Sequence, residues 1–520
     1  MRLGLLLLCI FLILSLFTWK AKICFNPDEL FYYKSSQTLS NLQTLYAPEY
    51  YGTPRFQKPP LFYSMVFVSF KLLGINWFSA RMVTVISSIL VLLVTYLLGR
   101  KMFDEEKAFF ATGILSTTVL FFRFGRIVLP EMTLILFMVL ALFFAYKAFH
   151  ENKRKDFYLT FLFMGIATLV KGPIGFILPV SVIAIFNLLN RKNFSSASIP
   201  WVQGFFIVLA FVLLWVVPVF LIYGEKFLGH IMTAEIADRM TDKAQFASVG
   251  AYIWHYFKNV SFYVPVAFAE YMPWSVLFFA AFFYARKKRE KTSYKTQRSF
   301  LLIWIITGFI IFTLIPKKRA HYVLLFFPAL SLYLISFFDF NYQGIRKAFK
   351  VFLSATVAVY FLAVIVVFPY IFTDGVDRLS VKLENSLTEK NIPVAVSWRL
   401  DPQEIELYID KPVYVVRESA FLGEGASKVG IEETRGDSPF FYLILAEKEH
   451  QEYLDMFLSH IKKTERTPVA YSILSSDWRW RKTINFKDFL YNTIKNPLEV
   501  KKYFINAFQE KVYLLEVKRK

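Results

Sequence analysis

The sequence predicts a mainly α-helical protein that crosses a membrane about eleven times and ends in a small α/β domain. Three observations support this fold class. Of the 520 residues, 56% are hydrophobic and only 19% are charged, whereas soluble domains carry roughly 25% charged residues. The apolar residues gather in runs of about 20, the length that a membrane-spanning helix requires. Charge is also divided unevenly: residues 1–373 hold 37 basic and 16 acidic side chains, and residues 374–520 hold 23 of each.

The predicted transmembrane domain covers residues 1–372. The first apolar run is followed by Trp19, Lys20 and Lys22 rather than by the small residues of a signal-peptide cleavage site. We therefore expect this segment to stay in place as an anchor. The eleven predicted spans begin near Leu3, Ala80, Ala108, Met132, Phe157, Pro173, Trp201, Pro265, Phe300, His321 and Val351.

Basic residues fall in alternate connections between the predicted spans. They follow the second, fourth, sixth, eighth and tenth spans, for example at Arg100, Lys153, Arg191, Arg286 and Arg346. Lys and Arg are enriched in cytoplasmic loops of membrane proteins. The pattern therefore predicts a cytoplasmic N-terminus, with loops 20–79 and 223–264 and the C-terminal domain outside. The net charge of +21 then reflects membrane topology, and a nucleic-acid partner is not expected.

Residues 373–520 predict a soluble extracytoplasmic α/β domain. Runs rich in β-branched and aromatic residues at 393–398, 412–416, 440–445 and 511–517 are typical of strands, and 447–457 is typical of a helix. We find no arrangement of residues in this domain that indicates catalysis. The chemistry is therefore expected in the outer loops of the transmembrane domain.

The first outer loop, residues 20–79, is the strongest candidate for function, because connections of this length are usually functional. It carries the adjacent carboxylates of Asp28 and Glu29 just outside the first span, and Lys58 further on. Two carboxylates beside lipid are costly unless they serve a site or stay hydrated. Asp28 also suits a helix N-cap, so the spacing alone leaves both interpretations open.

Further charged residues stand at the outer ends of later spans, where the topology rule predicts few cations. Such cations either reach lipid phosphates at the interface or converge on an anionic ligand. Several exceptions on one side favour the second interpretation, a lipid-phosphate substrate that enters from the bilayer. The residues are Arg123, Arg126, Glu131, Lys171, Lys317, Lys318, Arg319 and His321.

Seven short motifs occur in a specific order along the membrane part. They are Asp-Glu-x-x-Tyr at Asp28, Lys-Pro-Pro-Leu at Lys58, Arg-x-x-x-Pro-Glu at Arg126, Lys-Gly-Pro at Lys171, Glu-x-x-x-Arg at Glu235, Pro-Trp-Ser at Pro273 and Lys-Arg-x-x-Tyr at Lys318. In order and sidedness they resemble the GT-C glycosyltransferases of the aminoarabinose-lipid A transferase and protein O-mannosyltransferase type. The resemblance implies a GT-C fold, an inner-membrane location, and transfer of a sugar from a polyprenyl-phosphate donor on the outer face.

The resemblance also implies residue roles. Asp28 would orient or deprotonate the acceptor, and Glu131 is the second catalytic carboxylate. Gln57 stands where the family often has Glu, which puts in doubt a metal site that uses this carboxylate. We assign no cofactor, and a divalent metal ion stays an alternative. Glu131 stands where the family usually has Asp. The residues expected to bind substrate are Glu29, Tyr32, Lys58, Arg126, Lys171, Arg239, Lys318, Arg319 and Tyr322.

The expected reaction is a single in-line displacement that inverts the anomeric carbon. The departing polyprenyl phosphate needs fixed cations in a water-poor cavity. The favoured acceptor is lipid A or another glycolipid, because the outer domain resembles that of the lipid A transferases in placement. Transfer to a protein Ser or Thr is the alternative within this class. A flippase of lipid-linked sugars is the alternative of another class, but we find no internal repeat typical of transporters. A structural scaffold would leave the Asp28 and Lys58 segments unexplained.

Overall fold

A computed structural model describes residues 2–20, 28–50, 53–190, 199–230, 261–287, 294–315, 318–367, 394–397, 413–416, 440–446, 469–481 and 509–519. The chain divides into two compact units, of which the first comprises Met1–Lys20 and Phe31–Ile365 and the second Ala21–Leu30 and Val366–Lys520. The domain boundary predicted at residue 372 lies outside the described residues and stays a prediction.

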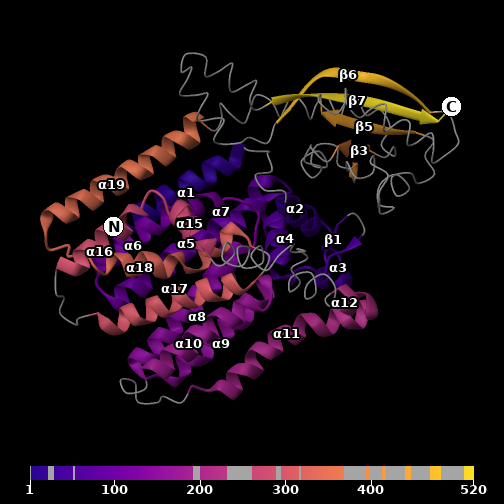
Figure 1. Ribbon diagram of the computed structural model, residues 1–520. Helices are drawn as coiled ribbons and strands as arrows, with labels where there is room; N and C mark the ends of the chain where they lie inside the picture. Colours follow the sequence, from indigo (N-terminus) through magenta and orange to yellow (C-terminus); the bar gives the residue numbers. More distant parts are fainter. Residues whose placement is uncertain are drawn as a thin grey trace, which may run out of the picture. The chain divides into compact units, whose positions relative to one another are not determined.

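The first unit is built from helices (Figure 1). A two-residue hairpin, β1 (Glu49–Tyr50) and β2 (Thr53–Pro54), interrupts them. The helices are α1 (Arg2–Lys20), α2 (Asp28–Gln37), whose first residues fall to the second unit, α3 (Leu42–Tyr46), α4 (Leu61–Leu73), α5 (Trp77–Met102), α6 (Glu105–Ser116), α7 (Val119–Phe124), α8 (Glu131–Glu151), α9 (Arg154–Lys171), α10 (Ile174–Leu189), α11 (Trp201–Tyr223), α12 (Glu225–His230), α15 (Tyr263–Glu270), α16 (Val276–Lys287), α17 (Lys295–Leu314), η2 (Ala320–Phe326), α18 (Phe327–Ile335), α19 (Gln343–Leu362) and the short π-helix η3 (Ala363–Val367).

The helices confirm a polytopic, mainly α-helical membrane protein. Among the described residues, five helices are long and apolar enough to cross a membrane, namely α5, α8, α11, α17 and α19 with its extension to Ile365. Shorter apolar helices are found at Leu3–Leu16, Leu61–Leu73, Ile174–Leu189 and Ala320–Ile335. The number of eleven spans stays a prediction. The first outer loop contains α4, a helix that the sequence analysis did not predict.

The third predicted span is broken into α6 and α7. The break falls at Thr117 and Thr118, whose hydroxyls donate to backbone carbonyls of the preceding turn. Thr118 then begins α7 as its N-cap, because its side chain accepts from the amide of Phe121. Trp274 donates its indole N–H to the Thr117 hydroxyl over 2.8 Å. A tertiary contact therefore holds the helix end at the break.

Helices α8 and α9 form an antiparallel pair with two chemically different ends. At one end the first residue of α8, Glu131, meets the last residue of α9, Lys171. At the other end Glu151 is paired with Lys153 over 2.7 Å, and Asn152 adopts the left-handed conformation, φ 53°, that ends many helices. We name the first the site end and the second the basic end. Helix α9 also packs against α10 and α11 (Figure 1).

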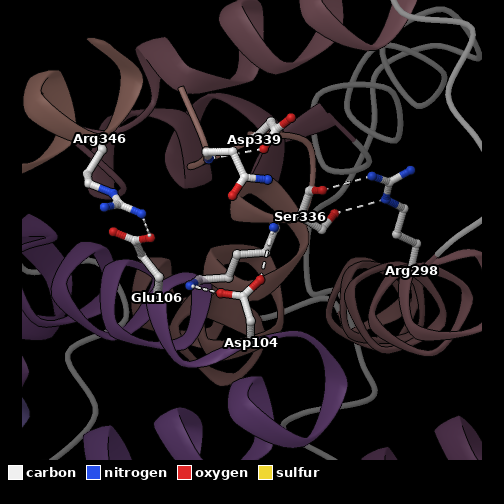
Figure 2. A network of polar contacts seen from close by, with 8 residues as sticks. Asp104, Glu106, Arg298, Ser336, Asp339 and Arg346 are labelled. Atoms are coloured by element: carbon white, nitrogen blue, oxygen red, sulfur yellow. Dashed lines mark hydrogen bonds and ion pairs between the residues drawn. The ribbon is translucent and has the colours of Figure 1, made fainter. Parts of the chain in front are cut away.

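Ion pairs and hydrogen bonds join four helices at the basic end (Figure 2). Arg346 of α19 is 2.6 Å from Glu106 of α6. Arg298 of α17 donates to the carbonyl of Ser336, just after α18, over 2.8 Å. Lys107 and Asp104 form a further pair over 3.1 Å at the start of α6. Of the residues that predicted a cytoplasmic face, Arg298 and Arg346 thus make polar contacts between helices.

We expect the network at the basic end to contribute little to stability and nothing to catalysis. In Arg346→Met the free energy of unfolding should fall by about 0.2–1 kcal/mol, because an exposed ion pair is screened by water. The side chain of Arg346 is 41% exposed. Unfolding by denaturant in detergent measures the first effect, and an assay of the sugar transfer expected from the sequence measures the second. A folded variant that has lost transfer would contradict this expectation.

The second unit contains a five-stranded mixed sheet in the order β4-β3-β5-β7-β6. Strand β3 is parallel to β4 and β5, and β7 is antiparallel to β5 and β6. Strands β3, β4, β5 and β7 lie at the four predicted runs, whereas β6 was not predicted, and its register shifts near Ser475 break the alternation. The predicted helix at 447–457 lies outside the described residues. The strands are β3 (Val394–Ser397), β4 (Val413–Val416), β5 (Phe440–Ala446), β6 (Val469–Arg481) and β7 (Gln509–Arg519).

Candidate active site

A buried carboxylate and a largely buried ammonium meet at the site end of α8 and α9. Lys171 donates from Nζ to Oε1 of Glu131 over 2.6 Å, and the two side chains are 12% and 5% exposed. Glu131 is the first residue of α8, where the helix dipole favours an anion. The low exposure of both partners limits screening by water and salt. The pair is therefore electrostatically strong and close to neutral as a unit.

A tight turn fixes the position of Lys171. Gly172 follows with φ 90°, a conformation that side chains rarely adopt, and Pro173 begins α10 with φ −56°. A Cβ added to Gly175 would lie 2.4 Å from the carbonyl carbon of Ala167. Helices α9 and α10 thus approach each other so closely that the turn has little freedom. The Lys-Gly-Pro motif is explained locally by this turn, which presents Lys171 to α8.

Helix η2 completes the cluster at the site end. Nε2 of His321 lies 3.2 Å from the same Oε1 of Glu131. The ring of His321 contacts the rings of Phe124 and Tyr322, with centroids 5.1 Å and 5.0 Å away. Nζ of Lys171 is 5.6 Å from the centroid of Tyr322. The structure therefore brings together residues from α7, α8, α9 and η2, three of which the sequence singled out as site residues.

The second oxygen of Glu131 differs from the first. Oε2 is buried, and within the part of the chain that the structure describes it has no hydrogen-bond partner. Buried carboxylate oxygens are normally satisfied, because an unmet acceptor costs free energy. This oxygen is thus available to a ligand that donates a hydrogen bond.

The neighbouring cations Lys318 and Arg319 are tied to nearby helices. Nζ of Lys318 donates to the carbonyl of Phe312 over 3.2 Å and to that of Ile315 over 2.8 Å. It thereby caps the last turn of α17, where the helix dipole is negative. Burial lowers the pKa of Lys318. The amide of Arg319 donates to the hydroxyl of Tyr263 over 3.3 Å. A role for either side chain in substrate binding stays a prediction.

One arginine lies in α7 and a second lies just after it. Arg126 is buried, and its guanidinium carbon is 4.3 Å from the ring centroid of Phe122. Arg123 is paired with Glu270 of α15 over 2.9 Å. The sequence analysis did not anticipate this pair, because the two residues are 147 positions apart and carry no shared local pattern. The pair fixes α7 against α15, next to the cluster around Glu131.

The segment that carries Lys58 is anchored by an apolar cluster. Phe56 packs against Tyr223 and Phe227, with ring centroids 5.1 Å and 5.5 Å away. Trp215 of α11 also donates its indole N–H to the carbonyl of Tyr46 over 3.1 Å. Nζ of Lys58 donates to the carbonyl of Gln57 over 2.9 Å. The outer loop is therefore held on α11 and α12, the helices that lead to residues 231–260. Arg239, a predicted phosphate ligand, lies outside the described residues.

Helix α2 carries the other predicted residues of the first loop. Asp28 and Glu29 form its first turn, and Glu29 is fully buried while Asp28 is half-buried. Tyr32 packs against Phe62 and Tyr63 of α4, with ring centroids 5.2 Å and 4.9 Å away. Both carboxylates therefore stand at a helix N-terminus, which suits either a cap or a functional acid.

The sequence placed His321 among the outer-side cations but assigned it no role in catalysis or substrate binding. Its signal was present, since a histidine among outer-side cations at the start of a span is unusual. Its contact with Glu131 could not be read, because 190 positions separate the two residues in the chain. Among the described residues no group of three or more His, Cys, Asp or Glu could hold a metal ion. The metal requirement stays unassigned.

Sequence comparisons point to membrane glycosyltransferases. Residues 57–217 match the family described as dolichyl-phosphate-mannose-protein mannosyltransferase. An uncharacterized protein of Aquifex aeolicus is 28% identical over 348 residues, which are 67% of this chain and 66% of that protein. Undecaprenyl phosphate-α-4-amino-4-deoxy-L-arabinose arabinosyl transferase 2 of Proteus mirabilis is 27% identical over 64% of this chain and 58% of its own length. The chain spans about half to two thirds of the length of the curated relatives it matches.

Solved structures show the same fold over nearly the whole chain. ArnT from Cupriavidus metallidurans bound to undecaprenyl phosphate has a TM-score of 0.65 at 15% identity, covering 99% of this chain and 97% of that one. The oligosaccharyltransferase of Archaeoglobus fulgidus with Zn and sulfate has a TM-score of 0.53 at 13% identity, covering 100% and 88%. The chain therefore has the fold of these membrane glycosyltransferases. The predicted GT-C fold class, and the resemblance on which it rested, are confirmed.

Proposed function

We propose that this protein transfers a sugar from a polyprenyl-phosphate donor to an acceptor on the extracytoplasmic face of the bacterial inner membrane. The observation that carries the proposal is the fold shared over 99% of the chain with ArnT bound to undecaprenyl phosphate. The arabinosyl transferases among the relatives support the same reaction class. The buried charges at the site end of the helices add a chemical reason, since polar groups in membrane proteins usually serve function.

The proposed reaction is one in-line displacement. An acceptor oxygen forms a bond to the anomeric carbon while the bond from that carbon to the phosphate oxygen breaks, which inverts the centre. Lys58 and Arg239 hold the departing phosphate, the arginine with two parallel hydrogen bonds. Asp28 accepts the proton of an acceptor hydroxyl. Fixed cations in a site with little water stabilise the charge that develops on the leaving group.

The proposed acceptor is lipid A or another glycolipid, in keeping with the named arabinosyl transferases. A Ser or Thr of a protein is the second candidate, favoured by the match of residues 57–217 to a protein mannosyltransferase family. The two acceptors differ in the base they need, because a hydroxyl must lose its proton during transfer whereas a lipid phosphate is already an anion. Asp28 acts by orientation and electrostatics in the latter case.

The test uses the full chain in lipid nanodiscs. Undecaprenyl phosphate carrying either aminoarabinose or mannose is mixed with lipid A or with a peptide rich in Ser and Thr, and products are weighed by mass spectrometry. We expect one donor to add its sugar mass to one acceptor. Movement of the donor across a vesicle bilayer with no covalent product would contradict the proposal and would favour a flippase instead.

A further inference from the structure

We propose that Lys171 and His321 are positioning residues for Glu131, and that the second oxygen of Glu131 binds a hydroxyl or ammonium group of the transferred sugar. The proposal rests on the proposed function and assigns a sugar subsite within it. Under this proposal Lys171 positions Glu131 and is not one of the cations that hold the phosphate.

The charges around Lys171 disfavour a phosphate. Nζ of Lys171 lies 2.6 Å from Oε1 of Glu131, and both side chains have little exposure to solvent. A phosphate brought to Lys171 would also approach the carboxylate, and like charges at close range in a poorly screened site repel strongly. A neutral hydroxyl or a cationic amine meets no such repulsion. The pair therefore suits the sugar rather than the phosphate of the donor.

The contacts of Glu131 fix the orientation of its carboxylate. Lys171 and His321 both contact Oε1, so the carboxylate is held from one side. The imidazole itself contacts the rings of Phe124 and Tyr322. Rotation of the carboxylate is thereby restricted, and Oε2 keeps one direction. A buried acceptor fixed in this way is prepared for a ligand before it binds.

The second oxygen of Glu131 requires a ligand that donates a hydrogen bond. Oε2 of Glu131 has no hydrogen-bond partner among the described residues, and as a carboxylate oxygen it can only accept a hydrogen bond. The polyprenyl chain and an ionised phosphate have no hydrogen-bond donor to offer. The hydroxyl and amino groups of the sugar do. Within the proposed donor, the sugar is the part that satisfies this oxygen.

The test compares His321→Phe and His321→Gln with the wild type in nanodiscs. Phenylalanine keeps the ring contacts but removes the nitrogen near Glu131, and glutamine returns a side-chain N–H. His150→Phe is the matched control, because it makes the same change at the opposite end of α8, where His150 stacks on Tyr146. The probes are undecaprenyl phosphate and the same lipid carrying aminoarabinose or mannose. Kd is measured for each lipid, and kcat and KM for transfer.

We expect the wild type to bind one of the two sugar-bearing lipids more tightly than it binds undecaprenyl phosphate. In His321→Phe this preference should disappear and kcat/KM should fall about 10- to 100-fold, the usual effect of losing a hydrogen bond to a charged group. Kd for undecaprenyl phosphate should stay within about threefold, which is less than 1 kcal/mol. His321→Gln should recover part of the loss, and His150→Phe should behave like the wild type.

Three results would overturn the proposal. The wild type could bind the sugar-bearing and sugar-free lipids equally well. His321→Phe could leave the preference and kcat/KM unchanged. The variant could also weaken the binding of undecaprenyl phosphate as much as the binding of the sugar-bearing lipid. That result would indicate that the cluster around Glu131 binds the phosphate. Failure of the proposed function is distinguishable, because the wild type would then prefer the sugar-bearing lipid without transferring its sugar.

Discussion

Replacing Lys171 with methionine is expected to abolish sugar transfer and to lower the free energy of unfolding by about 3–5 kcal/mol. The substitution leaves Glu131 buried without its ammonium partner, and an uncompensated buried charge is strongly destabilising. Loss of the pair also frees the carboxylate to rotate away from the sugar. Unfolding in a denaturing detergent titration measures the first effect, and the transfer assay measures the second.

The matched control is Lys101→Met at the basic end. Lys101 is also paired with a glutamate of α8, Glu151, but that carboxylate keeps Lys153 as a second partner. This control should retain transfer and lose little stability. The double variant Lys171→Met with Glu131→Gln should recover most of the stability, because it leaves no buried charge unpaired, but it should not recover transfer. A Lys171→Met protein as stable and active as the wild type would show that the pair is not important.

The second large effect is expected for Asp28→Asn, which should slow transfer to a hydroxyl acceptor by about 10²- to 10⁴-fold, the usual contribution of a general base. The substitution separates the two interpretations of Asp28. Asn caps a helix as well as Asp does, so a residue that only caps α2 would tolerate the change. A base or a charged orienting group would not. The measurement is kcat and KM with a saturating acceptor.

The control for Asp28 is Glu49→Gln, which removes a half-buried carboxylate from β1 in the same outer loop. Its transfer rate should stay within about twofold of the wild type, as expected for a substitution away from the site. If Asp28→Asn also stays within twofold, the carboxylate serves as a cap and the base lies elsewhere. If the acceptor is a lipid phosphate, the loss should be smaller, because no proton is removed from it.

The sequence was informative wherever the signal is local. Apolar runs predicted the membrane helices, because membrane thickness sets the length of contiguous segments. The orientation that the basic loops indicate stays a prediction. Glu131 and Lys171 were predicted as site residues from local signals too, since both stand at the ends of apolar runs. Their roles as paired charges were not evident, because pairing depends on how α8 and α9 pack.

Contacts between distant segments could not be predicted. His321 and Glu131, or Arg123 and Glu270, meet only because several helices converge at the site end. The break at Thr117 depends on Trp274, which lies 157 positions away. Strand β6 was not predicted, because the polar residues around its register shifts interrupt the alternation typical of a strand. In each case the deciding interaction is tertiary, and a window of neighbouring residues does not contain it.

The central claim is most directly tested by one transfer assay in membranes. It compares the wild type with Asp28→Ala and Lys58→Ala at equal amounts of folded protein, and it weighs both the lipids and the proteins by mass spectrometry after a polyprenyl-phosphate donor is supplied. Our account predicts that the wild type adds one sugar mass to a lipid or a protein and that both variants lose this product. A wild type that forms no glycosylated product, or two variants as active as the wild type, would contradict it.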